Sequence, residues 1–327
     1  MSLPEIKYCP GTLATGHSTY SKTCLNRVFQ GRKISHILPW DSPASNDVSD
    51  ELFIENQKRI SISGVQEKFS ILIEKNKLRL VEEREQGSHI LKPIPGAGRK
   101  PDQMPANEHL TMQIARQVYN IETAENAMIF FRDGSPAYIT RRFDLNDDGG
   151  KIAQEDFASL TGRTAPTYGE HYKYLGNYLE LFQRMKIDVP GHKVESIKLI
   201  KILVFNYLFS NGDAHFKNFS LIETPLGDYR LSPAYDLLNS RIHVNDKDFA
   251  LEDGLLPRNL SQGKVSHQFQ VLANRADIDA AVFDNLLSKM LIHSDAVEAL
   301  IFSSYLNEST RRNYWQSYQG RLKQLMK

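Results

Sequence analysis

Cysteine is scarce in this sequence, and neither sign of charge is in excess. Only Cys9 and Cys24 occur in the 327 residues, which is too few for a disulfide-rich scaffold. They also lack the short Cys-x-x-Cys spacing that structural zinc sites use. With 40 basic and 39 acidic residues the formal net charge is +1, so composition gives no reason to expect nucleic acid or an anionic membrane as the main partner.

Long apolar runs are also missing. The longest, residues 200–209, is interrupted by Lys201, and it falls well short of the roughly 20 residues that a membrane-spanning helix needs. The first residues, MSLPEIKYCPG, are too polar for the apolar centre of a secretory signal. We therefore expect a reduced, cytoplasmic protein that does not contact a membrane.

The glycine-rich signatures of nucleotide-binding loops are absent too. No stretch matches the P-loop pattern or the dinucleotide-binding fingerprint. The stretch SISGVQEKFS at residues 61–70 has a single glycine, Gly64, where a protein-kinase loop has three. A generic motif therefore does not identify a phosphate-binding loop in this chain.

The pattern of apolar residues divides the chain into a strand-rich half and a helix-rich half. Strands are expected in the first half, at residues 69–74, 77–82, 88–92, 127–131 and 136–143. Residues 1–50 look irregular, and a loop at residues 93–107 precedes a helix that Asn107 caps. Helices are expected in the second half, at residues 171–185, 193–211, 278–291 and 311–326.

This order of elements predicts an α+β fold with two lobes. We place a strand-rich N-terminal lobe at residues 1–143 and a mostly helical C-terminal lobe at residues 144–327. A cleft between two lobes is a common place for a ligand site.

Polar residues follow directly after the most apolar predicted helix. Asp213, His215, Lys217 and Asn218 lie within six positions. They could form a solvated turn whose side chains bond to the local backbone. An Asp and an Asn five positions apart is also the spacing of the protein-kinase catalytic loop, where the Asp accepts the substrate proton and the Asn holds a metal ion.

Three further residues fit a kinase-like site, each with a simpler alternative. Asp236 follows an expected β-hairpin, in the place of a second metal ligand, but it could instead cap a following helix. Lys92 closes a strand and could bind phosphates, although lysines at strand ends are common. Glu108 could pair with Lys92 or merely complement the dipole of its own helix.

Several stretches, taken together and in order, resemble the HipA-type serine/threonine kinases of bacterial toxin–antitoxin systems. They are SISGVQEKFSILI, HILKP, NEH, ITRRFD, NGDAHFKNFSL and LSPAYDLL. The resemblance implies a protein-kinase-like fold, ATP with Mg²⁺, and phosphorylation of a protein serine or threonine. Family targets include aminoacyl-tRNA synthetases, whose modification inhibits translation.

The resemblance also implies roles for individual residues. Asp213 resembles the catalytic base, and His215 and Lys217 complete its loop, with Lys217 placed to stabilise the transferring phosphoryl group. Asn218 and Asp236 resemble the metal ligands. The implied nucleotide contacts are Ser63, Gly64, Val65, Gln66, Lys68, the phosphate-binding Lys92, the hinge residues Arg142 and Phe143, the ribose contact Asp144, and Asn218.

Ser61 and Ser63 carry a further expectation from the same resemblance. A serine that opens this loop is autophosphorylated in the family, and a phosphate there would repel the phosphates of ATP. The SIS pattern and the short N-terminal region resemble HipT-like toxins of three-component systems. We therefore expect regulation by autophosphorylation, an antitoxin partner and a small separate protein that supplies the missing N-terminal domain.

Two rival functions remain open from the sequence. A small-molecule phosphotransferase on a similar fold would need a deep, acidic acceptor pocket and no self-phosphorylated serine. A catalytically silent binding module in a repressor complex would bind ATP without turning it over. Direct binding to nucleic acid is not expected, because no basic helix-turn-helix is evident.

Overall fold

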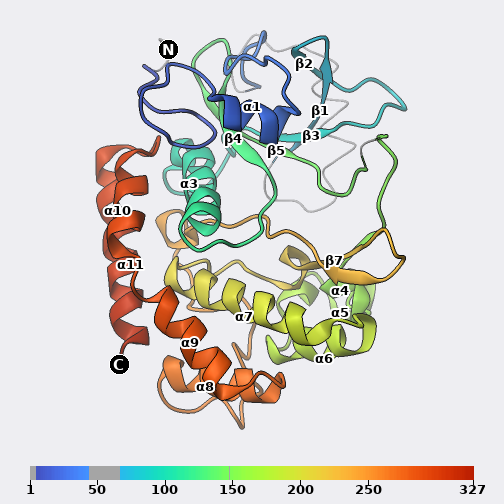
Figure 1. Cartoon of the computed structure of the whole chain (residues 1–327), viewed down its shortest axis with the longest axis vertical. Coiled ribbons are helices and arrows are strands. Elements are labelled where there is room, and N and C mark those ends of the chain that lie inside the picture. The colour runs from blue at the N-terminus through green and yellow to red at the C-terminus, as the bar shows by residue number, and fades with distance from the viewer. Residues whose placement is uncertain (1–4, 44–66, 147) are drawn as a thin grey trace.

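A computed structural model describes residues 5–43, 67–146 and 148–327. Its N-terminal part is built around a five-stranded antiparallel sheet, which lies in the upper half of Figure 1. In spatial order the strands are β2 (Lys77–Leu80), β1 (Phe69–Glu74), β3 (His89–Lys92), β5 (Pro136–Arg141) and β4 (Asn126–Phe130). The strands expected from the sequence in this half are thereby confirmed.

Local chemistry explains the first hairpin. Lys75 and Asn76 both have positive φ, 47° and 69°, which is the backbone shape of the tight two-residue turns that suit the twist of paired strands. The register then pairs Glu74 with Lys77 and Ile71 with Leu80. Alternate residues of β1 therefore point to the same face of the sheet.

The two faces of the sheet are covered by different helices. Ala127 and Ile139 belong to the core shared with α1 (Lys22–Phe29), whereas Met128 and Tyr138 belong to the core shared with α3 (Met104–Gln117). This division follows from the alternation of side chains along a strand. The expectation of an irregular N-terminus was wrong at α1, whose first turn is capped by the Ser21 hydroxyl accepting from the Cys24 N–H.

The start of α3 also corrects the sequence analysis. The helix begins at Met104, after a short 3₁₀ turn η1 (Pro101–Gln103), with Pro105 in its first turn. Asn107 is therefore not a cap but a buried residue within the helix. Its side chain bonds to the backbone of Asn239, donating to the carbonyl at 2.9 Å and accepting from the N–H at 3.0 Å.

The C-terminal part is mostly helical and carries a small second sheet. The sheet has the order β6 (Gln154–Asp156), β7 (Ser220–Glu223) and β8 (Tyr229–Leu231), and β6 was not expected from the sequence. The helices are α4 (Phe157–Leu160), α5 (Ala165–Tyr168), α6 (Leu179–Asp188), α7 (His192–Leu208), α8 (Val265–Arg275), α9 (Ala280–Met290), α10 (Ser294–Phe302) and α11 (Glu308–Leu325). Within the described ranges, no helix is both long and apolar enough to cross a bilayer.

One of the expected helices is interrupted. Residues 171–185 contain a short 3₁₀ turn, η2 (Tyr172–Tyr174), and α6 begins only at Leu179. Gly176 has φ of 94°, which a right-handed helix does not allow.

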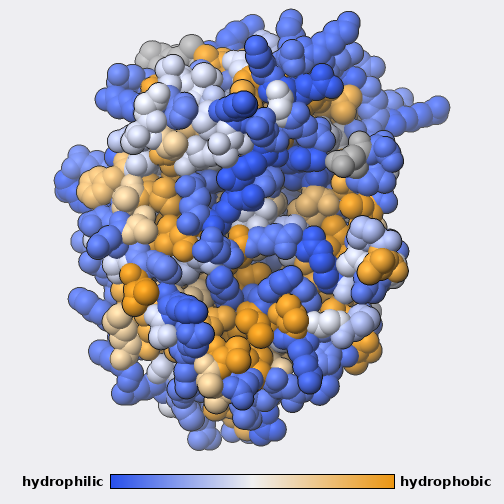
Figure 2. Space-filling view, in the orientation of Figure 1, coloured by the Kyte–Doolittle hydropathy of each residue, from blue (hydrophilic) through white to orange (hydrophobic). Residues whose placement is uncertain are grey.

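In Figure 2, hydrophilic residues dominate the surface of the N-terminal part, whereas hydrophobic residues gather on the surface of the helical part.

The last two helices brace α3 from outside the sheet. In Figure 1, α10 and α11 run along one side of the molecule beside α3. The Thr111 hydroxyl on α3 lies 2.8 Å from the Tyr314 hydroxyl on α11, and the Tyr119 hydroxyl lies 3.3 Å from that of Tyr318. Helix α3 is thus held by packing and hydrogen bonds that reach it from the end of the chain.

Candidate active site

The polar loop after α7 has a defined shape. Ser210 has φ of 53° and turns the chain away from the helix end. A short turn, η3 (Phe216–Asn218), then begins, and the residue before it bonds to its last residue: the His215 N–H donates to the Asn218 side chain at 3.1 Å. Ala214 and Phe216 are buried and anchor the loop. Asp213, which directly precedes Ala214, is exposed.

Gly212 is needed where this loop meets the segment after η4 (Ser240–Ile242). A Cβ at this position would lie 2.5 Å from the backbone oxygen of Lys247. Backbone cannot move aside as the end of a side chain can, so any larger residue would displace the loop that carries Asp213.

Asp213 is held by a tyrosine that the sequence analysis did not single out. The Tyr174 hydroxyl donates to its carboxylate at 2.8 Å, and the Lys173 ammonium lies over the Tyr174 ring, 5.1 Å from its centroid. Although Asp213 is accessible, desolvation by the protein around it raises its pKa, and the hydrogen bond from Tyr174 opposes the rise. A carboxylate with a raised pKa is a better proton acceptor. Tyr174 was missed because its stretch was taken for the middle of a helix.

Asp236 and Asn218 meet across the β7–β8 hairpin. The Asn218 amide nitrogen donates to the Asp236 carboxylate at 3.4 Å. Asp236 does not cap a helix: it has φ of 55°, and the next helical turn, η4, begins only at Ser240. The Tyr235 hydroxyl donates to the Lys217 carbonyl at 2.8 Å and ties the two segments together.

Lys92 links the sheet to both α3 and the C-terminal part. Its ammonium donates to the Glu108 carboxylate at 2.7 Å and to the Asp236 carboxylate at 2.5 Å. The side chains of Lys92 and Glu108 are only 5% and 4% exposed. The alternative that Glu108 serves only its helix dipole is therefore wrong, because it forms a buried ion pair with Lys92.

Lys92, Glu108 and Asp236 shift one another's pKa values. Burial would lower the pKa of Lys92, but Asp236 and Glu108 outweigh it and raise that pKa. Burial would raise the pKa of Asp236, but Lys92 and Lys68 outweigh it and lower that pKa. Burial raises the pKa of Glu108 despite the charge of Lys92. The site therefore holds a charged lysine and an ionised Asp236, whereas burial works against the ionised form of Glu108.

The remaining residues of the predicted site lie around this centre. Arg142 and Asp144 form an ion pair, with the Arg142 Nε donating at 2.9 Å, so the carboxylate expected at a ribose is engaged by arginine. The Phe143 ring packs against the Tyr235 ring at 5.7 Å between centroids. His215 is buried, and desolvation lowers its pKa to about 3, so its ring is neutral near pH 7.

Part of the expected phosphate loop lies outside the described residues. Ser61, Ser63, Gly64, Val65 and Gln66 belong to the undescribed stretch 44–66. Lys68 is described and precedes β1, and its charge acts on both Asp236 and Glu108.

The donor set suits a particular kind of metal ion. Among the described residues, no group of three or more His, Cys, Asp and Glu side chains could hold a metal by itself. Asp236 offers a carboxylate, and the Asn218 side chain lies beside it, with its amide nitrogen toward Asp236 and its oxygen accepting from the His215 N–H, an oxygen that has a second lone pair. Mg²⁺ is usually bound in this way, through one or two protein ligands plus the phosphates of a substrate. The residues present therefore fit Mg²⁺ bound together with a nucleotide, and they do not fit an all-protein metal cage.

Comparison with protein families identifies most of the chain. A family model described as the HipA-like C-terminal domain matches residues 60–297. Among curated proteins, the Sinorhizobium fredii protein Y4dM is 31% identical over 64% of this chain and 52% of its own length. A Haemophilus influenzae protein is 25% identical over 57% of this chain and 54% of its own length. Both are provisionally named as kinases, and this chain spans about half of their length.

Solved structures agree on the fold. A chain of the Shewanella oneidensis MR-1 complex of HipA, HipB and operator DNA aligns with a TM-score of 0.61 at 19% identity, covering 82% of this chain and 65% of that one. The Helicobacter pylori proinflammatory kinase CtkA aligns with a TM-score of 0.51 at 14% identity, covering 78% of this chain and 92% of that one. The predicted α+β, kinase-like fold is thereby confirmed.

Proposed function

The chain belongs to the family of HipA-like C-terminal domains, and from that premise we propose that it is a protein kinase. In this proposal it transfers the γ-phosphoryl group of ATP to a serine or threonine hydroxyl of a protein. The observation that carries the proposal is the ammonium of Lys92, bonded at once to Glu108 on α3 and to Asp236 beside the catalytic loop. Protein kinases use this lysine–glutamate pair and a metal-binding aspartate together.

Each residue has a separate task in the proposed mechanism. Asp213 accepts the proton of the attacking hydroxyl, with Tyr174 holding its carboxylate in place. Lys92 binds the nucleotide phosphates, and Lys217 stabilises the charge on the transferring group. Asn218 and Asp236 would hold Mg²⁺, which when bound neutralises phosphate charge.

We assign the hinge residues a positional role in the same proposal. The backbone of Arg142 and Phe143, which follow β5 directly, would face the adenine through groups other than the Arg142 N–H, which donates to the Ser88 carbonyl at 2.9 Å. Asp144 would contact the ribose after exchanging its bond to Arg142. The division into lobes at residue 143 follows from this hinge and remains a prediction.

The proposal extends to regulation and partners. Autophosphorylation at Ser61 or Ser63 would add negative charge to this loop and repel the phosphates of ATP. The similar Shewanella protein is seen in a complex with HipB and operator DNA. We therefore propose that this chain binds an antitoxin and that the antitoxin, not this chain, contacts DNA. We also propose a small separate protein as a second partner.

The proposed biological role is that of the toxin of a HipA-like system in the cytoplasm. Its protein substrate would be part of the translation machinery, with an aminoacyl-tRNA synthetase as the first candidate. This assignment rests on family membership.

Intact-mass spectrometry tests the proposal directly. Protein verified as unmodified is incubated with Mg-ATP, and a mass gain of one or two phosphoryl groups that maps to residues 61–63 is expected. The Asp213→Ala variant should bind ATP and gain no mass. If the wild-type protein binds ATP and gains no phosphate, the protein-kinase proposal fails in favour of a silent binding module or a small-molecule phosphotransferase.

A further inference from the structure

A separate pocket lies beside the predicted hinge. It measures about 330 Å³ and is bounded by the end of α3, the loop that leads into β4, and the residues that follow β5. Arg116, Glu125 and Phe143 line it, whereas none of the residues proposed for catalysis or metal binding does. Its size lies within the range of small-molecule sites.

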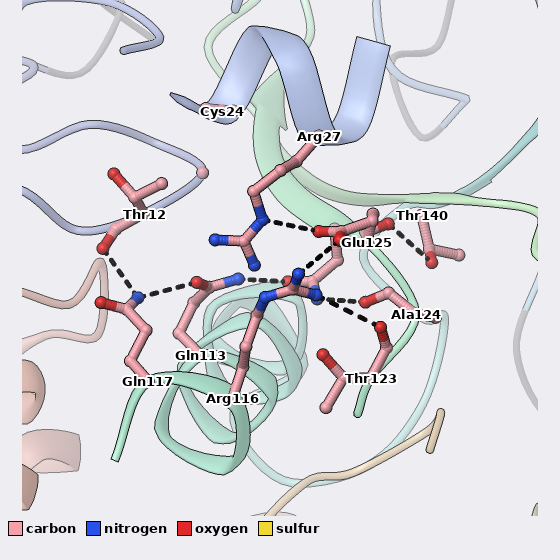
Figure 3. Close-up of polar contacts among 12 residues, drawn as sticks. Thr12, Cys24, Arg27, Gln113, Arg116, Gln117, Thr123, Ala124, Glu125 and Thr140 are labelled. Carbon is pink, nitrogen blue, oxygen red and sulfur yellow. Dashed lines mark hydrogen bonds and ion pairs between the residues drawn. The ribbon is translucent and has the colours of Figure 1, made fainter. Parts of the chain in front are cut away.

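The charges at this pocket are unbalanced. Glu125 is paired with two arginines: the Arg27 Nε lies 3.0 Å from one carboxylate oxygen, and Arg116 Nη2 lies 2.6 Å from the other. Figure 3 shows the Glu125 carboxylate between these two guanidinium groups, with Arg27 reaching down from α1 and Arg116 up from α3. Two cations therefore share one anion, and one positive charge remains.

Donor groups remain available around the same carboxylate. The two terminal nitrogens of Arg27 make no hydrogen bond to the part of the chain that the structure describes, as Figure 3 shows. The three side chains are between 24% and 29% exposed, so the cluster is reachable from solvent. Burial raises the pKa of Glu125, and Arg27 opposes that rise.

Of the other charged residues that line the pocket, two are paired, and the third is Arg141. Glu122 is bonded to Arg230 at 3.1 Å, and Arg142 is paired with Asp144. A further lining residue, Thr123, is 4% exposed, and its buried hydroxyl has no hydrogen-bond partner among the described residues. Buried hydroxyls usually have a partner, so this one is an independent sign that the pocket is incomplete without a ligand.

We propose that this pocket binds a small anion that carries phosphate or carboxylate groups. Arg116 is its main charge partner, because guanidinium groups bind such anions through two parallel hydrogen bonds. Glu125 competes with the ligand for Arg116 and Arg27 and keeps the arginines in place when the pocket is empty. Since Phe143 lies both in this pocket and against Tyr235, the ligand sits next to the nucleotide site without entering it.

Calorimetric titration with pyrophosphate and with citrate tests the inference. Saturating ADP is present throughout, so that the proposed nucleotide site is occupied and the anions can bind only at the pocket. Saturable binding is expected there, and Arg116→Gln should weaken it by about tenfold, the usual effect of losing one charge-assisted contact. Arg132→Gln, which removes a surface arginine paired with Asp41, should leave the affinity unchanged.

The Glu125→Gln variant separates a ligand site from a structural ion cluster. It removes the competing carboxylate, so it should tighten anion binding while Arg116→Gln weakens it. General damage to the fold would instead weaken binding in both variants. Absence of saturable binding at millimolar anion, or equal affinity in the Arg116→Gln variant, would overturn the inference.

Discussion

Replacing Lys92 by methionine is predicted to destabilise the protein strongly before any nucleotide is considered. The substitution keeps the length and apolar stem of the side chain but removes a buried ammonium with two carboxylate partners. Glu108 is 4% exposed, so water cannot replace the lost partner. Breaking a buried pair from one side costs about 3–5 kcal/mol, and we expect the free energy of unfolding near pH 7 to fall by that amount.

The loss should depend on pH, with a sign that can be worked out. Burial already raises the pKa of Glu108, and Lys92 is the charge that opposes the rise. Without Lys92, folded Glu108 binds a proton more readily than the unfolded chain does, so stability increases as pH falls. The difference from wild type should therefore narrow between pH 7 and pH 5. The pKa of Asp236 should rise in the same variant, because burial raises it and Lys92 is the main charge that lowers it, with Lys68 left as a cation that still opposes the rise.

Urea denaturation followed by circular dichroism measures the effect, and two controls make it specific. The Lys92→Met/Glu108→Gln double variant should recover at least half of the loss and depend less on pH than the single variant, because only Asp236 is then left without the lysine. Lys186→Met, which breaks an exposed pair with Asp277, should cost no more than about 1 kcal/mol. If the double variant is as unstable as the single one at both pH values, the unpaired carboxylate is not the cause and the reasoning is refuted.

Two further substitutions test other parts of the structure. Tyr174→Phe should lower kcat about tenfold, because one hydrogen bond that positions Asp213 is lost. Since that bond lowers the pKa of Asp213, the acidic limb of the pH–rate profile should also move to higher pH. An unchanged profile would exclude the positioning role. Gly11→Ala would place a Cβ 2.0 Å from the Cys24 sulfur and should lower the free energy of unfolding by about 1–3 kcal/mol. Gly96→Ala meets nothing within 4 Å, so this control should melt with the wild type.

Sequence spacing predicted the part of the site that lies on one continuous segment. Asp213 and Asn218 are five positions apart, and a short turn needs only local backbone geometry to bring them together. Lys92 and Asp236 were both predicted as site residues, but their direct contact spans 144 positions and depends on how the sheet packs on the C-terminal part. Spacing along the chain carries no information about such a distance.

What the sequence analysis missed depends on packing between distant segments. Tyr174 reaches Asp213 from a turn that apolar periodicity misassigned to a helix. Asn107 was predicted to be a cap because its residue type favours caps. It is instead buried inside α3, where hydrogen bonds to the backbone of Asn239 satisfy its side chain. Helix α1 is too short for its periodicity to be read, and its position is set by packing against the sheet.

The rate of phosphoryl transfer by the Asp213→Asn variant tests the central claim most directly. Asparagine keeps the shape of the side chain and can still accept a hydrogen bond from Tyr174, but it cannot take up a proton at neutral pH. The account predicts that Mg-ATP binds with wild-type affinity while transfer from ATP falls by about 10²–10⁴-fold. Transfer at the wild-type rate would contradict the assignment of Asp213 as the catalytic base.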